Sequence, residues 1–370
     1  MLPGQPTQLF VRTCCIVAIH LIIWTESNGM RAVVSPRKYR HHEVFEGFRR
    51  WSGQVPSGFD ADFLGSRYQT AYFAFTPWFT PQPDARYETP SYPLFDEQYF
   101  EWIDLLEAVK SARGRFTMFE LGAGFGCWTA RAAAAAQQRN LPYSLVAVEA
   151  EPTHFEWLKQ NLQDNGVMLA DCRLIHAAVT GKDGRIGFSA GNPAGWYGQA
   201  IGGTTEVEAV SLTTLLRPLD RADLIDMDVQ GAEFEILSAA INSLSEKVKR
   251  VHVETHSEQL HTSILRLFRG LGWKPRFLYM SNTADKTPWG RIIFQGGIQS
   301  WLNPRLCSKD ELRYTRTLQN SMMWRTLNLG RRVIDRIAPP GTLRRRAFKA
   351  TLSRVGNKYR RDPEDVLRRG

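Results

Sequence analysis

Acidic side chains follow several apolar segments of this 370-residue chain. Glu120 and Glu149 each end a short apolar run, and Asp226 and Asp228 end a third. Carboxylates in such positions can accept a proton or bind the hydroxyls of a ribose. In an open α/β sheet, ligands bind beyond the carboxyl ends of the strands, so these acids mark a candidate site.

Three glycines come just after the first of these acids. Gly122, Gly124 and Gly126 form the pattern G-x-G-x-G behind Glu120. Glycine accepts positive φ angles and lets a ligand approach the backbone closely. The spacing therefore predicts a tight, ligand-binding turn.

The segments around the glycines predict how this turn is held. Residues 116–121 read as a buried parallel strand, and the Ala-rich residues 127–139 read as a helix. Residues 143–148 read as a second strand, which ends in Glu149. Strand, glycine turn, helix and strand, closed by an acid, are typical of a site for a nucleoside-type cofactor, with Glu149 on the ribose hydroxyls.

The acid before the glycines narrows the choice of cofactor. A dinucleotide site uses G-x-G-x-x-G and binds a pyrophosphate at the start of the helix. Glu120 would repel a pyrophosphate, which disfavours an NAD-dependent oxidoreductase. It suits a ligand that carries an ammonium and a sulfonium.

A second group of polar side chains could carry the reaction itself. Asp226 and Asp228 are two residues apart, as are His252, Glu254 and His256 at the end of the next predicted strand. Alternate residues of a strand share a face, so each set would project to one side. Three interpretations remain open: a general base for an alcohol, a divalent metal site, or a hydrogen-bonded polar network. We take Asp228 as the first candidate base, His256 as the second, and expect no metal.

A glycine-rich loop over 189–203 is the candidate lid. Trp196 and Tyr197 lie in its middle and would shield the site from water. Glu233 opens the helix after Asp228 and would orient a loop or the substrate. Glu254 is expected on the substrate side of the same site.

Two segments resemble a known family. The glycine stretch resembles motif I of class I S-adenosylmethionine-dependent methyltransferases, which implies that Glu120 and the glycines hold the methionine part and Glu149 the ribose. The segment LIDMDVQGAEFEIL resembles the D-V-x-G-A-E signature of FkbM-type methyltransferases, with Asp228, Gly231, Ala232 and Glu233 as the matching residues. Many members carry a lysine where this chain has Asp226.

The resemblance, which covers about 97–304, implies a fold and an activity. The fold is α/β, a Rossmann-like class I methyltransferase fold with a mostly parallel sheet and helices on both faces. We expect a terminal antiparallel strand pair at 277–280 and 291–295. The expected activity is O-methylation of a hydroxyl on a sugar, glycoside or secondary metabolite, with S-adenosylmethionine as cofactor. One alternative is an RNA methyltransferase that uses the basic tail to bind nucleic acid, although the lack of an N-P-P-Y motif counts against N-methylation of a base. The other is a catalytically silent scaffold that binds the cofactor.

Charge and composition divide the chain into three parts. Residues 1–95 form an N-terminal extension with an aromatic, proline-rich cap, 96–304 the methyltransferase domain, and 305–370 a basic tail with two expected helices. Residues 301–370 carry 18 Lys and Arg against 6 Asp and Glu, so the net charge of +10 belongs to the tail. A nucleic acid or an anionic membrane could bind it, but a solvated basic face is the simpler interpretation.

Cysteine usage and the N-terminus bear on localisation. The five cysteines have no C-x-x-C spacing, which favours a reducing compartment. The apolar run 14–24 is too short to span a bilayer and has no evident cleavage site after it. We expect no functional signal peptide and a cytoplasmic protein.

Overall fold

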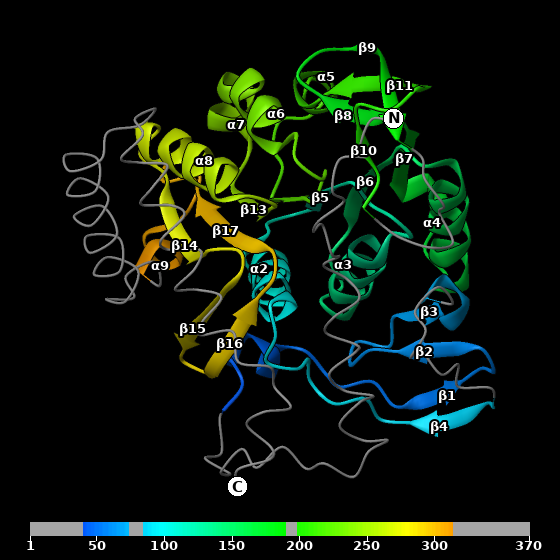
Figure 1. Ribbon diagram of the computed structural model, residues 1–370. Helices are drawn as coiled ribbons and strands as arrows, with labels where there is room; N and C mark the ends of the chain where they lie inside the picture. The colour runs from blue at the N-terminus through cyan, green and yellow to red at the C-terminus, as the bar shows by residue number, and fades with distance from the viewer. Residues whose placement is uncertain (1–39, 74–83, 190–197, 314–370) are drawn as a thin grey trace, which may run out of the picture. The chain divides into compact units, whose positions relative to one another are not determined.

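The computed structural model describes residues 40–73, 84–189 and 198–313. Within these ranges the centre is a seven-stranded sheet of order β14-β17-β13-β12-β5-β6-β7 (Figure 1). Its strands are β5 (Phe116–Leu121), β6 (Tyr143–Glu149), β7 (Cys172–His176), β12 (Leu224–Met227), β13 (Arg250–Thr255), β14 (Lys274–Tyr279) and β17 (Gly297–Leu302). All six residues of β5 are buried, as expected for a strand in the middle of a covered parallel sheet.

The strand directions confirm the mostly parallel α/β fold. Strands β7, β6, β5, β12 and β13 are parallel, and β17 is antiparallel to both β13 and β14. The strand predicted at 291–295 is present, but its expected pairing with the strand at 277–280 was wrong. These residues overlap β16 (Gly290–Phe294), which pairs only with β15 (Thr283–Thr287) in a separate hairpin. The antiparallel partner of β14 is β17, which the sequence pattern did not reveal.

Helices cover both faces of the sheet (Figure 1). Helices α2, α3 and α4 pack against one face, and α8 packs against β13 and β17 on the other, next to α6. The helices of the described residues are α2 (Gln98–Ser111), α3 (Cys127–Gln138), α4 (Pro152–Asp164), α5 (Leu212–Leu216), α6 (Glu233–Ala239), α7 (Ile241–Lys247), α8 (Glu258–Gly270) and α9 (Lys309–Arg313).

The order of the strands places a crevice between β5 and β12. The chain runs from β5 outward to β6 and β7, and then returns to the other side of β5 as β12. Strand order reverses at this point, and ligands of such sheets bind beyond the carboxyl ends of the strands there. The glycine turn after β5 and the aspartates at the end of β12 therefore meet at the expected binding position.

Residues before α2 pack against that helix. Phe45 stacks on Tyr99 and Phe63 lies against Trp102, and all four side chains are buried. This segment contains the antiparallel pairs β1 (Gly53–Val55) with β4 (Arg86–Glu88) and β2 (Phe59–Ala61) with β3 (Arg67–Gln69). Its short 3-10 helices are η1 (Glu43–Gly47) and η2 (Thr70–Phe73).

A smaller sheet lies beyond β7 along the chain. It has the order β10-β9-β11-β8, formed by β8 (Ala178–Thr180), β9 (Gly184–Ser189), β10 (Ala200–Ile201) and β11 (Thr205–Ser211). A further 3-10 helix, η3 (Leu169–Asp171), precedes β7. Helices predicted at 317–337 and 343–358 lie outside the described residues, and no helix in the described ranges is long and apolar enough to cross a membrane.

Candidate active site

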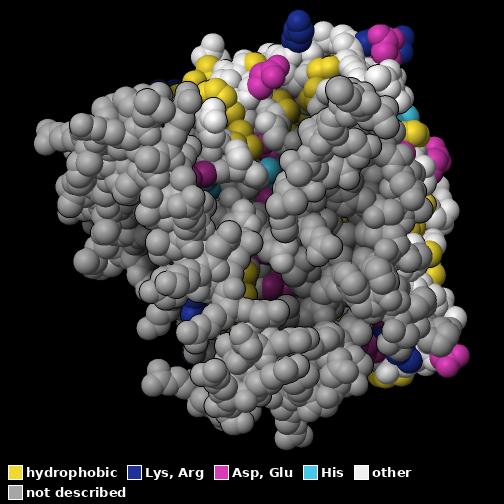
Figure 2. Space-filling view, in the orientation of Figure 1, with side chains coloured by type: hydrophobic (Ala, Val, Ile, Leu, Met, Phe, Trp, Pro, Cys, Tyr) yellow, Lys and Arg dark blue, Asp and Glu magenta, His cyan; other side chains and the backbone are white. Residues whose placement is uncertain are grey.

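A cavity of about 190 Å³ lies at the carboxyl ends of β5, β6, β12 and β13. Acidic and histidine side chains are visible on the described surface near the middle of Figure 2. The predicted site residues that line this cavity are Glu120, Gly122, Gly124, Glu149, Asp226, Asp228 and Glu254. The structure thus brings most of the predicted site together in one place.

The turn after β5 can be built only with glycines. Gly122, Gly124 and Gly126 have φ angles of 82°, 54° and 72°, in the left-handed region. A Cβ on Gly122 would overlap the carbonyl oxygen of Asp228, and one on Gly126 would overlap the side chain of Leu158. The turn therefore lies flat against β12 and α4 and leaves its backbone facing the cavity.

Glu120 holds the start of α3. Its carboxylate accepts hydrogen bonds from the backbone N–H groups of Trp128 (3.2 Å) and Thr129 (2.8 Å), and from the Thr129 hydroxyl. These N–H groups have no partner within the helix, so the carboxylate takes the place of a capping side chain that Gly126 lacks. Burial raises the pKa of Glu120 to about 8.

Glu149 ties the end of β6 to the glycine turn. Its Oε2 accepts a hydrogen bond from the Gly124 N–H and its Oε1 one from the Glu151 N–H, both at 2.7 Å. Burial raises the pKa of this carboxyl to about 7. Glu149 therefore lines the cavity beside the turn, where the prediction places the ribose.

Asp226 belongs to a row of side chains across three strands. It is in register with Glu120 on β5 and with His252 on β13. His252 is turned toward α2, where its Nδ1 lies 2.7 Å from the buried carboxylate of Asp104. Burial raises the pKa of Asp226 to about 6, and the charges of Asp228 and Asp104 add to this effect.

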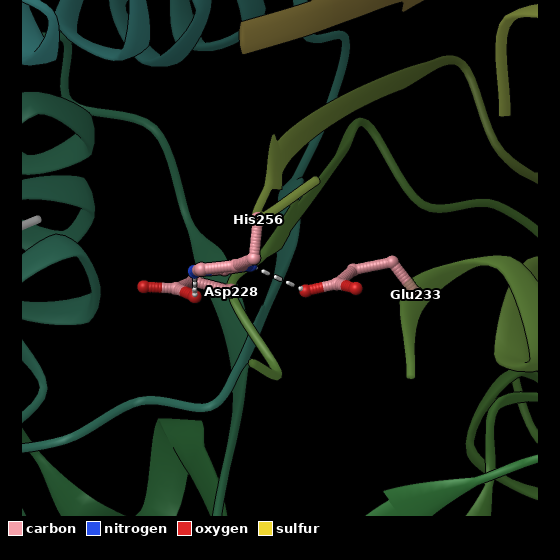
Figure 3. A group of neighbouring side chains, drawn as sticks. All are labelled: Asp228, Glu233 and His256. Atoms are coloured by element: carbon pink, nitrogen blue, oxygen red, sulfur yellow. Dashed lines mark hydrogen bonds and ion pairs between the residues drawn. The ribbon is translucent and has the colours of Figure 1, made fainter. Parts of the chain in front are cut away.

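Asp228, His256 and Glu233 form a separate group (Figure 3). Asp228 Oδ1 lies 3.2 Å from His256 Nε2, and His256 Nδ1 lies 3.2 Å from Glu233 Oε1. Burial disfavours the charged imidazole, but the two carboxylates outweigh this effect and raise the pKa of His256 to about 11. The histidine is therefore an imidazolium held between two acids.

Only one member of this group reaches the cavity. Asp228 lines it, with a side chain that is 32% exposed, whereas His256 and Glu233 are absent from the described lining. Glu233 is fully buried and also accepts a hydrogen bond from the Gly231 N–H at 3.0 Å. Glu233 thus orients the Gly231 turn and His256, and Asp228 faces the ligand space.

The same three residues could serve as metal ligands. One ligand atom of each lies within 4.8 Å of the others. In this arrangement, however, the imidazole ring lies between the two carboxylates, where a shared cation would have to bind (Figure 3). The geometry is that of an ion-paired histidine.

Some predicted residues lie elsewhere, and some residues of the site were not predicted. Trp196 and Tyr197 fall outside the described residues, but Gln199 and Ile201, which follow them, line the cavity. Gln98 and Glu101 of α2, Arg131 of α3 and Tyr68 of β3 also line it. The one indication of its role in the sequence was that Arg131 is a charged residue within the alanine-rich segment of α3.

Comparison with known proteins identifies the domain that carries this cavity. Residues 120–275 match the methyltransferase FkbM domain family. This part of the chain is an FkbM-type methyltransferase domain. A putative methyltransferase of Jannaschia sp. (strain CCS1) is 27% identical over 191 residues, which are 47% of this chain and 67% of that protein.

Solved structures with a related arrangement include two methyltransferases. The FkbM methyltransferase of Methylobacillus flagellatus KT has a TM-score of 0.37 at 12% identity, over 52% of this chain and 45% of that one. The precorrin-6y C5,15-methyltransferase of Geobacter metallireducens GS-15 has a TM-score of 0.36 at 12% identity, over 57% and 90%. Similarities at this level add nothing about the reaction.

The FkbM-type domain uses S-adenosylmethionine as methyl donor, and the cavity fits this molecule. The glycine turn lines the cavity with backbone, and buried acids line it as well, which suits a ligand that carries a sulfonium and an ammonium. The end of the cavity beyond Glu149 is apolar and suits an adenine ring. It is lined by Ala177, Ala178, Val179, Phe188 and Ile201.

Proposed function

We propose that this protein transfers the methyl group of S-adenosylmethionine to a hydroxyl oxygen of a small molecule, such as a sugar, a glycoside or another secondary metabolite. The observation that carries the proposal is the position of Asp228. Its carboxylate lines the cavity directly beside the glycine turn, whose residue Gly122 touches the Asp228 backbone. A base in this place can remove the proton of an acceptor hydroxyl next to the methyl donor.

The methyl donor, when bound, supplies a methyl group already activated by its sulfonium. The protein must then position the acceptor and accept its proton. Asp228 is the general base that accepts this proton, and a positioned base typically contributes about 10²–10⁴ in rate. Alignment of the reacting atoms can contribute about 7–11 kcal/mol in favourable cases.

His256 acts through Asp228. Its two ring nitrogens face Asp228 and Glu233, so neither is directed at the cavity. The positive ring lies 3.2 Å from Asp228 Oδ1 and helps to orient the carboxylate that accepts the proton. The Gln230 amide donates a hydrogen bond to Asp228 Oδ1 at 2.8 Å and fixes the same carboxylate from the loop side.

The proposal is tested by following the transferred carbon. S-adenosylmethionine with a ¹³C-labelled methyl group is incubated with the protein and a panel of sugars, glycosides and phenols, and the products are observed by NMR. The proposal predicts a labelled O-methyl signal with at least one class of hydroxyl acceptor. Labelled N-methyl or C-methyl products without an O-methyl product would show that the acceptor atom is wrong.

A further inference from the structure

Arg131 is a buried cation on the first turns of α3. The residue is 9% exposed, and its guanidinium packs against two indole rings that meet edge-to-face, 4.4 Å from the centroid of Trp102 and 4.3 Å from that of Trp128. Its Nε lies 3.2 Å from Asp62 Oδ2. Stacking and the ion pair hold the side chain in one orientation.

Part of this guanidinium has no partner. Nη1 is buried and makes no hydrogen bond to any described residue. An unpaired buried donor typically costs about 1–3 kcal/mol, and more when it is charged. Such a group is retained where a ligand supplies the missing acceptor, and Arg131 lines the same cavity as the glycine turn.

The Asp62 carboxylate does not pair with all of the guanidinium N–H groups, because the N-terminal segment fixes its position. Its Oδ1 accepts hydrogen bonds from the backbone N–H groups of Leu64 (2.9 Å) and Ser66 (3.2 Å). The carboxylate is thus anchored at the β2–β3 turn and meets Arg131 through Nε. An anionic ligand group can still bind the guanidinium without displacing Asp62.

The cavity has two chemically different ends. This difference indicates which anionic group of the ligand binds Arg131. Beyond Glu149 the cavity is apolar, whereas Arg131 of α3 lines it together with Glu101 of α2, Glu120 of β5 and Asp226 of β12. With adenine at the apolar end and ribose at Glu149, the methionine part points to the polar end. A cation and several acids together match a zwitterion, which carries one carboxylate and one ammonium.

We infer that Arg131 binds the carboxylate of the methionine part of S-adenosylmethionine. The acids on the same walls face the ammonium. This inference rests on the cofactor and not on the identity of the acceptor or the base. It also gives the segment before α2 a role in binding, because Asp62 pairs with Arg131 and Tyr68 lines the cavity.

The test compares two ligands that differ only in the carboxylate. S-adenosylhomocysteine and its decarboxylated analogue, S-adenosyl-3-thiopropylamine, are titrated by calorimetry into the full-length protein. The wild type should bind S-adenosylhomocysteine roughly 10–100-fold more tightly, as expected for charge-assisted hydrogen bonds. In Arg131→Met this ratio should fall to about 1, because only the carboxylate-bearing ligand loses a partner.

Matched variants separate binding from folding. Arg139→Met removes an exposed arginine at the end of the same helix and should leave the ratio unchanged. If Arg131→Met does not fold by circular dichroism, Arg131→Lys takes its place, and the ratio should lie between those of the wild type and 1. A wild type that does not discriminate, or an Arg131 variant that keeps the full ratio, would overturn the inference.

Discussion

Gly122 and Asp228 are in direct backbone contact, with the α-carbon of the glycine against the carbonyl oxygen of the aspartate. The Asp228 N–H also donates a hydrogen bond to Leu121 O at 3.0 Å. The first glycine of the cofactor turn therefore touches the residue that we assign as the base. Movement of either one shifts the other, so cofactor binding and base positioning share one piece of backbone.

This contact predicts an unequal effect of two glycine substitutions. Gly122 and Gly114 have similar φ angles of 82° and 74°, but only Gly122 has an atom in the way of a Cβ. Both alanine variants should lose about 1–2 kcal/mol for the left-handed backbone. Gly122→Ala should lose about 1–3 kcal/mol more because of the overlap. Urea unfolding measures both, and equal losses would show that the backbone contact is loose.

The imidazole of His256 should stay protonated at neutral pH. Its folded pKa is raised to about 11 against an ordinary value near 6.5, so its stabilising effect is complete below about pH 6.5 and is lost as the pH rises toward 11. NMR of the ring carbons should show no titration of His256 between about pH 6 and 9. In Glu233→Gln the midpoint should move down, since one of the two carboxylates is gone. Glu235→Gln, on the same helix but exposed, is the control, and a wild-type midpoint near 6.5 would contradict the ion-pair assignment.

Binding of S-adenosylmethionine should release protons at pH 7. Burial raises the pKa of Glu120 to about 8 and that of Glu149 to about 7, so both carboxyls are partly protonated there. The sulfonium and ammonium near Glu120 and the ribose hydroxyls at Glu149 favour the ionised carboxylates, and the protons leave. S-adenosylhomocysteine lacks the sulfonium charge and should release fewer.

Calorimetry in two buffers of different ionisation enthalpy counts these protons. Glu120→Gln resembles the protonated carboxyl and should reduce the release. Proton uptake, or an equal release with both ligands, would mean that the sulfonium does not bind near these acids.

Local patterns predicted the centre of the fold well. The run at 116–121, the glycines and the alanines of α3 each act through neighbouring residues, so the β5–turn–α3–β6 unit follows from the sequence alone. The carboxylates at the strand ends were found in the same way. Because parallel strands end at one edge of the sheet, their order along the chain was enough to bring them together.

The missed features depend on contacts between distant segments. Strand β17 contains Gln299 and Ser300, both fully buried, so its residues do not form an apolar run. Gln299 donates a hydrogen bond to the His261 carbonyl at 2.6 Å, and Ser300 donates one to Asp104 at 2.7 Å. These partners make a buried polar strand acceptable, but only the folded chain shows them.

The same limit applies to charged residues inside helices. Arg131 and Asp104 look like surface charges in the sequence, yet each is buried against aromatic or ionic partners from other elements. The sequence allowed His256 to act as a base, but in the structure its two ring nitrogens face Asp228 and Glu233. A spacing of two residues indicates a shared face and says nothing about the partners on it.

The most direct test of the central claim is the rate of methyl transfer by Asp228→Asn. With an acceptor from the labelled-methyl panel, a single-turnover experiment at saturating S-adenosylmethionine compares this variant with the wild type, and calorimetry with S-adenosylhomocysteine checks that the cofactor still binds. We predict unchanged cofactor affinity and a transfer rate lower by about 10²–10⁴. A variant that binds the cofactor and transfers the methyl group at the wild-type rate would contradict the assignment of Asp228 as the base.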